Sequence, residues 1–161
     1  MVKNNIAGWA LAGLVLVGVL PAQPVLAQRN QQNPTASPTV AQSAELQEAA
    51  RLHQQVLELY RQGRYAGALP LAQRSLAIFE QALGKDHPHV ASSLNNLAGL
   101  YQAQGNYGAA LPLYQRSLAI REQALGKDHP DVATSLNNLA GLYRDQGNYG
   151  AALPLYQRSL A

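Results

Sequence analysis

Two Asp-His pairs, Asp86-His87 and Asp128-His129, are the residues of this sequence whose types could support chemistry. A histidine beside a carboxylate can bind a metal ion or act as a general base, but a metal needs further ligands at fixed short distances. The two pairs stand 42 residues apart, and neither has a recognisable nucleophile motif near it. We expect the aspartates to cap helices instead, with Asp131 favourable in a first turn. The sequence therefore predicts neither a metal site nor a catalytic site.

Other chemistry is also missing from the sequence. The absence of Cys excludes disulfides, thiolate metal sites and Cys nucleophiles. No Gly-rich phosphate loop, nucleophile elbow or paired-carboxylate motif is present. The net charge of +3 is not concentrated in any Lys/Arg run, whereas nucleic-acid binders usually carry a basic stripe. We therefore expect no enzymatic activity, no cofactor and no nucleic-acid partner.

Residues 1–27 are typical of a secretory signal peptide. Lys3 provides a short positive region, an uncharged apolar run of 15 residues extends from Ile6 to Leu20, and small residues precede a cleavage site between Ala27 and Gln28. The run is shorter than the roughly 20 residues that a membrane-spanning helix needs. We expect export to the periplasm or the extracellular space. The alternative is an uncleaved segment that tethers the chain to a membrane.

Residues 28–43 are rich in Gln and contain Pro34 and Pro38, with almost no bulky apolar side chain. Such a stretch cannot bury enough surface to offset the entropy lost on ordering. The composition predicts a flexible linker.

Comparison of the chain with itself reveals a tandem repeat. Residues 84–119 and 126–161 align at an offset of 42 residues with 32 of 36 positions identical, and residues 63–83 match 105–125 at 16 of 21 positions. Repetition at such a period is typical of stacked supersecondary units. We divide the array at residues 44–161 into units 44–84, 85–126 and 127–161.

Each unit predicts two helices. In the second unit, Asp86 or His87 opens the first helix, and Pro88 stands in its first turn, where a missing N–H does no harm. Apolar residues then recur at helical spacing. They are Val90, Leu94, Leu97, Ala98 and Tyr101 in the first helix, and Ala110, Leu113, Tyr114, Leu118 and Ile120 in the second. Gly105-Asn106 supplies the turn between them, and Gly126 is placed for a left-handed C-cap.

These residues resemble the tetratricopeptide repeat (TPR). The spacing of Leu94, Leu97, Ala98, Tyr101, Gly105, Tyr107, Ala110 and Tyr114 matches the TPR pattern, with Ser117 where Ala is usual. The 42-residue period is similar to that of kinesin-light-chain repeats, a type also found in many bacterial proteins. The resemblance implies an all-α solenoid of about three antiparallel helix pairs. We expect the last helix to be truncated, because Ala161 corresponds to Ala119 and nothing in the sequence matches Ile120–Leu125.

The first unit departs from the pattern. Leu59-Tyr60 stands one residue nearer to Gly63 than Leu100-Tyr101 stands to Gly105. Terminal repeats are often atypical because one face meets solvent, so we expect this unit to cap the array.

The resemblance also implies where a ligand binds, since the first helices of successive TPR units line a concave groove. Amide side chains dominate the corresponding positions and can both donate to and accept from the backbone of an extended peptide. We expect one Asn of each pair to tie neighbouring helices together and the other to face the groove. The candidate groove residues are Gln54 in the first unit, Ser92, Asn95, Asn96 and Gln102 in the second, and Thr134, Asn137, Asn138, Arg144 and Asp145 in the third.

Groove positions account for most of the differences between the second and third units. Of the four pairs that differ, Ser92/Thr134, Gln102/Arg144 and Ala103/Asp145 fall on the groove, and His89/Asp131 does not. Such differences indicate either a groove tuned for a ligand or exposed positions that tolerate change. A Lys/Arg clamp for a C-terminal carboxylate, found in some TPR proteins, is missing here.

Three functional hypotheses follow. The first is a non-catalytic scaffold that binds a protein or an extended peptide in the groove. The second is an N-terminal regulatory or targeting array of a larger protein, because similar exported bacterial arrays often precede a caspase-like peptidase domain. The third is self-association through the uncapped last helix.

Overall fold

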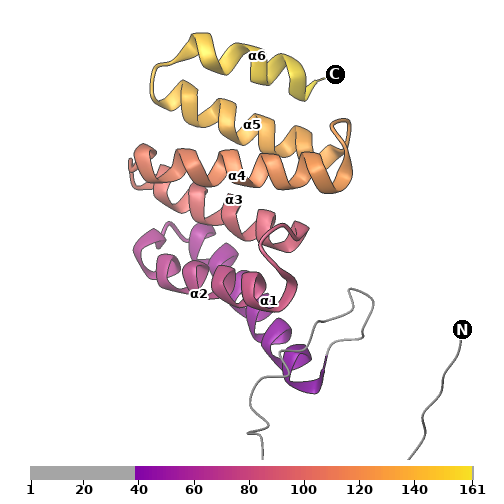
Figure 1. The fold of residues 1–161 in the computed structure, drawn as a ribbon. Helices are drawn as coiled ribbons and strands as arrows, with labels where there is room; N and C mark the ends of the chain where they lie inside the picture. Colours follow the sequence, from indigo (N-terminus) through magenta and orange to yellow (C-terminus); the bar gives the residue numbers. More distant parts are fainter. Residues whose placement is uncertain (1–38, 161) are drawn as a thin grey trace, which may run out of the picture. The chain divides into compact units, whose positions relative to one another are not determined.

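A computed structural model describes residues 39–160, which form six α-helices and no strand. The helices are α1 (Val40–Arg61), α2 (Tyr65–Leu83), α3 (Pro88–Ala103), α4 (Tyr107–Leu125), α5 (Pro130–Asp145) and α6 (Tyr149–Ser159). Each helix packs against the next in sequence, and α1 also contacts α3 (Figure 1). This is the predicted all-α solenoid of three helix pairs, with α6 of 11 residues where α2 and α4 have 19.

The array begins earlier than the sequence indicated. Helix α1 starts at Val40 rather than near residue 44, because Thr39 and Gln42 form a capping box. The backbone N–H of Gln42 donates to the Thr39 hydroxyl at 3.3 Å, and the backbone N–H of Thr39 donates to the side-chain oxygen of Gln42 at 2.8 Å. These bonds satisfy two backbone groups that a helix end leaves free. The predicted signal peptide at residues 1–27, and most of the predicted linker, lie outside the described residues.

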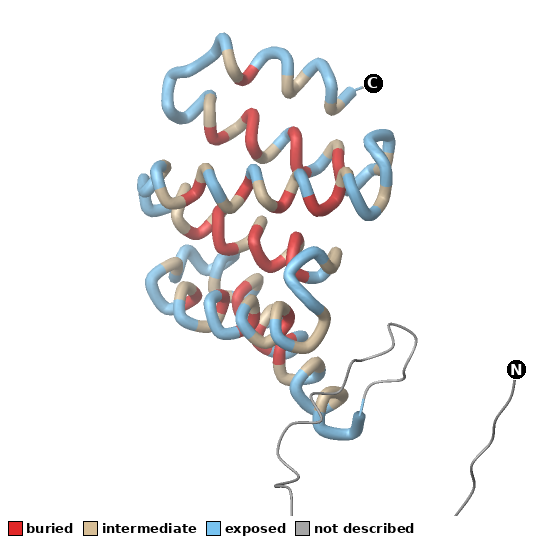
Figure 2. Tube along the Cα trace, in the orientation of Figure 1, coloured by how far each residue is buried: buried red, intermediate tan, exposed pale blue. Residues whose placement is uncertain are grey.

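Apolar stripes build the core where the helical spacing predicted it. Figure 2 shows the buried residues along the sides of helices that meet a neighbour. Val90, Leu94 and Ala98 of α3 are fully buried, and Ala110 and Ile120 of α4 are at most 4 % exposed. Between the two helices of one unit, the Ser117 hydroxyl donates to the Ala91 carbonyl at 2.8 Å, and Ser75 donates to Ala49 in the same way at 2.9 Å. The Ser that replaces the usual Ala is therefore a tie between paired helices.

The helix ends differ in detail from the prediction. His87 and His129, not the neighbouring aspartates, are the N-caps of α3 and α5, and each Nδ1 accepts from the backbone N–H two residues on at 3.1 Å. Gly126 has the predicted positive φ of 86°, but its ψ of 158° places it in an extended region that only glycine occupies readily, rather than in the left-handed helix region.

The two ends of the array present different surfaces. Glu48 and Gln55 of α1 stand at the positions of the buried Val90 and Leu97, and this polar face fits the expected capping role of the first unit. At the other end, Leu153 of α6 is 59 % exposed. None of the helices within residues 40–159 combines the length and apolar character required to cross a membrane.

Candidate functional site

An amide ladder joins the first helices of successive units. The Asn138 side chain on α5 donates to the Asn95 side chain on α3 at 2.9 Å, and the Asn96 side chain lies 3.1 Å from His53 Nε2 on α1. His53 occupies in the first unit the position of Asn95 in the second. Both amides of the second unit therefore take part in the ladder, and both also line a cavity of about 180 Å³.

One position per unit continues the lined surface along the array. Tyr60, Gln102 and Arg144 stand 42 residues apart in sequence, and all three line an open cavity of about 650 Å³. The other lining residues are Tyr114, Asn137, Asn138, Gly141 and Tyr156. Because Tyr60, Tyr114 and Asn138 also line the smaller cavity, the two hollows share one wall. We call these two cavities and their lining the tyrosine-amide groove.

A polar chain crosses the groove between the second and third units. The Tyr114 hydroxyl donates to Gln102 Oε1 at 2.9 Å, and Gln102 Nε2 donates to Asp145 Oδ2 at 2.6 Å. Asp145 Oδ1 accepts from Nε and Nη2 of Arg144 at 3.1 and 2.9 Å. Each side chain is thereby held in one orientation before any ligand arrives, which reduces the ordering cost of binding.

The pKa values along this chain follow its contacts. Burial raises the pKa of the Tyr114 phenol, and the nearby Tyr60 and Asp145 add to the effect, so Tyr114 is a neutral donor. The hydrogen bond from Gln102, followed by that from Arg144, lowers the pKa of Asp145. The groove between these units thus holds one acidic and one basic side chain, Asp145 and Arg144, which form an ion pair with each other.

Small residues make room for the tyrosines. A Cβ added to Gly99 would lie 3.5 Å from the Tyr114 hydroxyl, and one added to Gly141 would lie 3.8 Å from the Tyr156 hydroxyl. In the first unit, the position of Gly99 is Leu57 and that of Tyr114 is Ala72, so bulk has moved from one helix to the other. The tyrosine wall therefore belongs to the second and third units, and the first unit contributes Tyr60 instead.

The predicted residues fall into distinct groups. Asn95, Asn96, Gln102, Asn137, Asn138 and Arg144 line the tyrosine-amide groove, and Asp145 bonds to two of them. The hydroxyls of Ser92 and Thr134 instead donate to carbonyls one turn back in their own helices, Pro88 and Pro130. Gln54 and Ser92 line a separate cavity at the junction of the first and second units.

Sequence reasoning missed the tyrosines. The sequence marks Tyr60 only by its atypical spacing to Gly63, and the structure shows it 42 % exposed on the groove. The signal was present in the 42-residue alignment, which pairs Tyr60 with Gln102 and Arg144. Tyr114 is predicted in the apolar stripe of a second helix, because spacing alone does not show that its hydroxyl reaches the groove.

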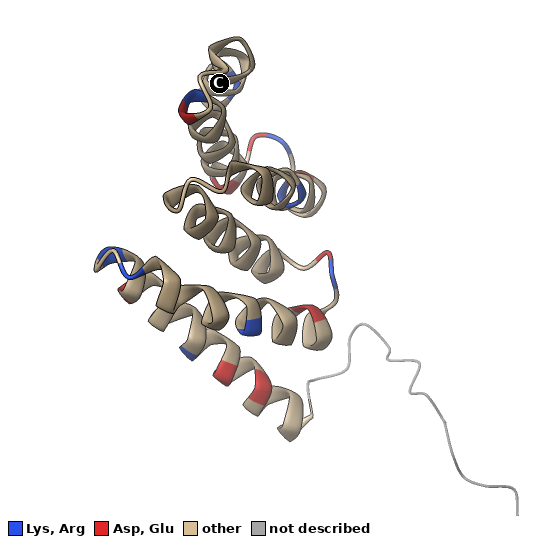
Figure 3. Ribbon diagram, turned by 90° about the vertical axis from the view of Figure 1, so that its left-hand side faces the viewer, with Lys and Arg blue, Asp and Glu red and all other residues tan. Residues whose placement is uncertain are grey.

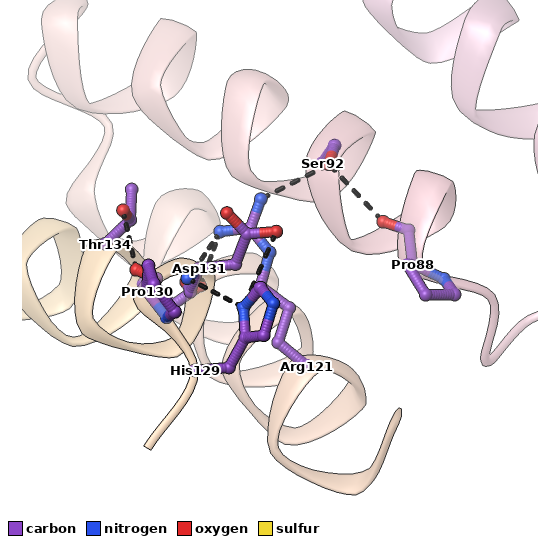
Figure 4. A network of polar contacts seen from close by, with 8 residues as sticks. Pro88, Ser92, Arg121, His129, Pro130, Asp131 and Thr134 are labelled. Atoms are coloured by element: carbon purple, nitrogen blue, oxygen red, sulfur yellow. Dashed lines mark hydrogen bonds and ion pairs between the residues drawn. The ribbon is translucent and has the colours of Figure 1, made fainter. Parts of the chain in front are cut away.

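Arg121 supports the junction between the second and third units (Figure 4). Its Nη1 donates to the Asp131 carbonyl at 3.1 Å and to the Ser135 hydroxyl at 2.8 Å, and its Nη2 donates to the Ser92 hydroxyl at 3.2 Å. Burial lowers the pKa of this guanidinium, and Asp131 opposes that shift. A buried arginine is tolerable only when its donors are used, so this network fixes the angle at which α5 meets α3 and α4.

Charges are sparse and mixed over the described part of the chain. Figure 3 shows basic and acidic residues dispersed along the ribbon. In sequence, Lys85-Asp86 and Lys127-Asp128 are adjacent in the loops between units. Residues 39–160 contain no cluster of three or more His, Asp or Glu arranged to hold a metal ion. The groove offers aromatic faces, amides and one bonded ion pair, all of which suit noncovalent recognition.

Comparison with known proteins places the fold. The sequence model described as tetratricopeptide repeat matches residues 59–123 and 89–161. Similar solved structures include BtubC (BKLC) from P. vanneervenii, at 24 % identity and a TM-score of 0.64, with 70 % of this chain and 45 % of that chain covered. A Podosopora anserina protein described as a kinesin light chain with nearly identical TPR-like repeats has 27 % identity and a TM-score of 0.63, over 68 % of this chain and 52 % of that one.

The TPR domain of Arabidopsis FLU is similar at 18 % identity and a TM-score of 0.63, over 72 % of this chain and 94 % of that one. The likenesses to BtubC and to FLU concern the fold alone. The chain spans about half the length of BtubC and of the Podosopora anserina protein.

Proposed function

The chain belongs to the tetratricopeptide repeat family, and from this premise we propose that it is a non-catalytic scaffold that binds a protein or an extended peptide. TPR domains generally bind proteins or peptides. The binding surface in this proposal is the tyrosine-amide groove, where α1, α3 and α5 each contribute a side chain at the same position of the unit.

One observation carries the proposal, namely the row of Tyr60, Gln102 and Arg144 along an open cavity of about 650 Å³. Tyrosine and arginine are the residue types that most often dominate binding energy at protein interfaces. The amides between them offer donors and acceptors to a peptide backbone. Since Arg144 is bonded to Asp145, the groove favours a partner segment with little net charge.

Selection from a phage-displayed random peptide library on the full chain tests this function. We expect enriched peptides whose affinity falls by roughly 30-fold or more in the Tyr60→Ala, Arg144→Ala double variant, since hot-spot residues contribute about 2 kcal/mol or more. Gln81→Ala, at an exposed site on α2, is the matched control. Equal binding by the double variant, with unchanged helicity by circular dichroism, would move the site elsewhere.

Asn137 offers a second and cleaner probe than Asn95. Removal of the Asn95 amide would also break its bond to Asn138 and loosen the stack, whereas Asn137 is exposed and lines the groove. We expect Asn137→Ala to weaken the selected peptides without lowering the melting temperature. A large drop in melting temperature would instead assign Asn137 a structural role.

The scaffold is proposed to work outside the cytoplasm, after removal of residues 1–27. The motivation is the sequence of that segment, with its charged start, its apolar run and its small residues before Gln28. Intact-mass measurement of the chain recovered from a bacterial host tests it. We expect a product that begins at Gln28. A membrane-bound product that retains Met1 would support the tethered alternative.

Self-association through α6 is a second candidate function. Tyr149 and Leu153 of α6 are 68 % and 59 % exposed, whereas Tyr107 and Leu111 at the same positions of α4 are half-buried. Adjacent exposed apolar side chains often mark an interaction surface. Sedimentation velocity over a concentration series decides the matter, and a strictly monomeric species would remove this candidate.

A further inference from the structure

A separate cavity, of about 500 Å³, opens at the junction between the first and second units and is not part of the tyrosine-amide groove. Its lining comes from α1, α2 and the start of α3. The lining residues are Leu46, Ala50, His53, Gln54, Phe79, Leu83, His87, His89 and Ser92. None of them is Asp, Glu, Lys or Arg, so apolar and neutral polar groups dominate the surface that a ligand would meet. We call this hollow the junction cavity.

Three stacked rings form part of its lining. The ring of Phe79 lies 5.5 Å from that of His89 with 19° between their planes, and His89 lies 5.2 Å from His87 with 23°. Burial lowers the pKa of both His53 and His87, and the neighbouring His89 adds to the effect. His53 and His87 therefore favour the neutral form near pH 7.

The equivalent place at the next junction is filled. Arg121 stands at the position of Phe79 and bonds to Ser92, to the Asp131 carbonyl and to Ser135. Ala50, His89 and Ser93 hold the corresponding positions at the first junction. The side chain of Ala50 has no group that can form a hydrogen bond, and the buried Ser93 hydroxyl has no hydrogen-bond partner. The junction cavity thus results from a matched set of exchanges, and not from loose packing of one side chain.

We propose that the junction cavity is a binding site for a small, neutral, planar aromatic molecule. A volume of about 500 Å³ lies within the usual range of small-molecule sites, which are mostly apolar with a few polar groups that fix orientation. A ligand ring can continue the stack of Phe79, His89 and His87 in an offset arrangement. Gln54 supplies an amide in the lining that can donate and accept hydrogen bonds, whereas the Ser92 hydroxyl already bonds to Pro88 and Arg121. A charged ligand would find no opposite charge there and would lose hydration without compensation.

Titration of the full chain with indole tests the site, followed by NMR of labelled histidine and tyrosine rings and leucine methyl groups. We expect saturable shifts at His53, His89 and Leu46, and no comparable shifts at Tyr60 or Tyr114. Benzoate and benzylammonium are the charged comparators, and each should bind roughly tenfold or more weakly than indole. Equal binding of the charged compounds, or shifts centred on the tyrosine-amide groove, would overturn the assignment.

Two reciprocal double variants give the matched controls. Phe79→Arg with His89→Asp introduces the residues that close the second junction, and should weaken indole binding roughly tenfold or more. Arg121→Phe with Asp131→His should create a second indole site between the second and third units. Undiminished indole binding by the first variant would exclude the junction cavity.

Ala50→Phe provides a second test of the junction cavity in case the Phe79→Arg, His89→Asp double variant fails to fold. Ala50 lies at an exposed position of the lining, so the added ring can enter the cavity without disturbing the core. It should also abolish indole binding, and unchanged binding would contradict the proposal. If free indole causes no shift but peptides selected on the chain shift His89 and Leu46, the cavity belongs to a partner's side chain, and the small-molecule assignment is wrong. Failure of peptide selection alone would leave the indole result standing.

Discussion

The two junctions between units share one backbone pattern but solve the same packing problem by opposite means. Between α2 and α3, Phe79 stacks on His89, and the Ser93 hydroxyl is buried without a partner. Between α4 and α5, the guanidinium of Arg121 stands at the position of Phe79 and bonds to Ser135, the counterpart of Ser93. One junction is an aromatic stack beside an open cavity, and the other is a closed polar network.

The difference shows what repetition does and does not determine. Buried aliphatic residues such as Leu94 and Leu136 recur in register in the cores of successive units. The residues between units are free to change in sets, because a new side chain at one site must match those around it. Phe79 with His89, and Arg121 with Asp131, are two such matched pairs. Substitutions placed at equivalent positions of the two junctions test whether this difference determines their stability.

Removal of the aromatic ring at the first junction should have the largest effect. Phe79→Ala deletes a side chain that is 6 % exposed and belongs to the same buried cluster as Val90 and Leu94. We therefore expect the free energy of unfolding to fall by about 3–5 kcal/mol. Urea denaturation followed by circular dichroism measures the change. A loss of under about 1 kcal/mol would mean that the stack contributes little and that the cavity already weakens this junction.

Arg121→Met removes the charge at the second junction but keeps an apolar stem of similar length. The acceptors at Asp131, Ser135 and Ser92 lose their donor, and the desolvation cost of the buried guanidinium disappears with it. We expect a net loss of about 1–3 kcal/mol in the same denaturation assay. An increase in stability would show that the arginine is retained for specificity of the junction and not for its strength.

Ser93→Ala and Ser135→Ala apply one substitution to both junctions and should differ in sign. Ser93 has a buried hydroxyl without a partner, so its removal should raise the free energy of unfolding by up to about 1 kcal/mol. Ser135 accepts from Arg121, so its removal should lower the free energy by about 1–2 kcal/mol. Thermal melts of the two variants beside the parent chain give the comparison. Changes of the same sign would contradict the account of both junctions.

The fold was predictable because it depends on features that a sequence displays directly. The 42-residue period, Pro88 at a helix start and the positive-φ glycines between helices are local signals, and the structure confirms all three. The sequence offers both Asp86 and His87 as the cap, and it could not choose between them, since both side chains can accept a backbone N–H and only the local geometry selects His87.

The candidate site was predictable only in part. Amide positions such as Asn95 and Asn138 follow from the family pattern, but their bond to each other depends on how far one unit is displaced against the next. The same is true of Arg121, which reads as an exposed helix residue in sequence and is 7 % exposed in the structure. Contacts between units depend on three-dimensional stacking, which a pattern within one unit does not specify.

A pH titration of stability separates the junctions by the smallest expected effect. His53 has a pKa below its ordinary value of 6.5, so the unfolded chain binds more protons than the folded chain below that pH. The contribution of His53 to the free energy of unfolding is therefore fully present above pH 6.5, and it is lost as the pH falls toward the lowered pKa of His53. His53→Asn installs the residue found at position 95 and keeps an acceptor for Asn96, as Asn95 accepts from Asn138. We expect this variant to lose less stability between pH 7 and pH 5 than the parent chain, measured by urea denaturation at each pH. An unchanged pH dependence would assign the acid sensitivity to groups other than His53, such as His87 at the same junction, whose pKa is also lowered by burial.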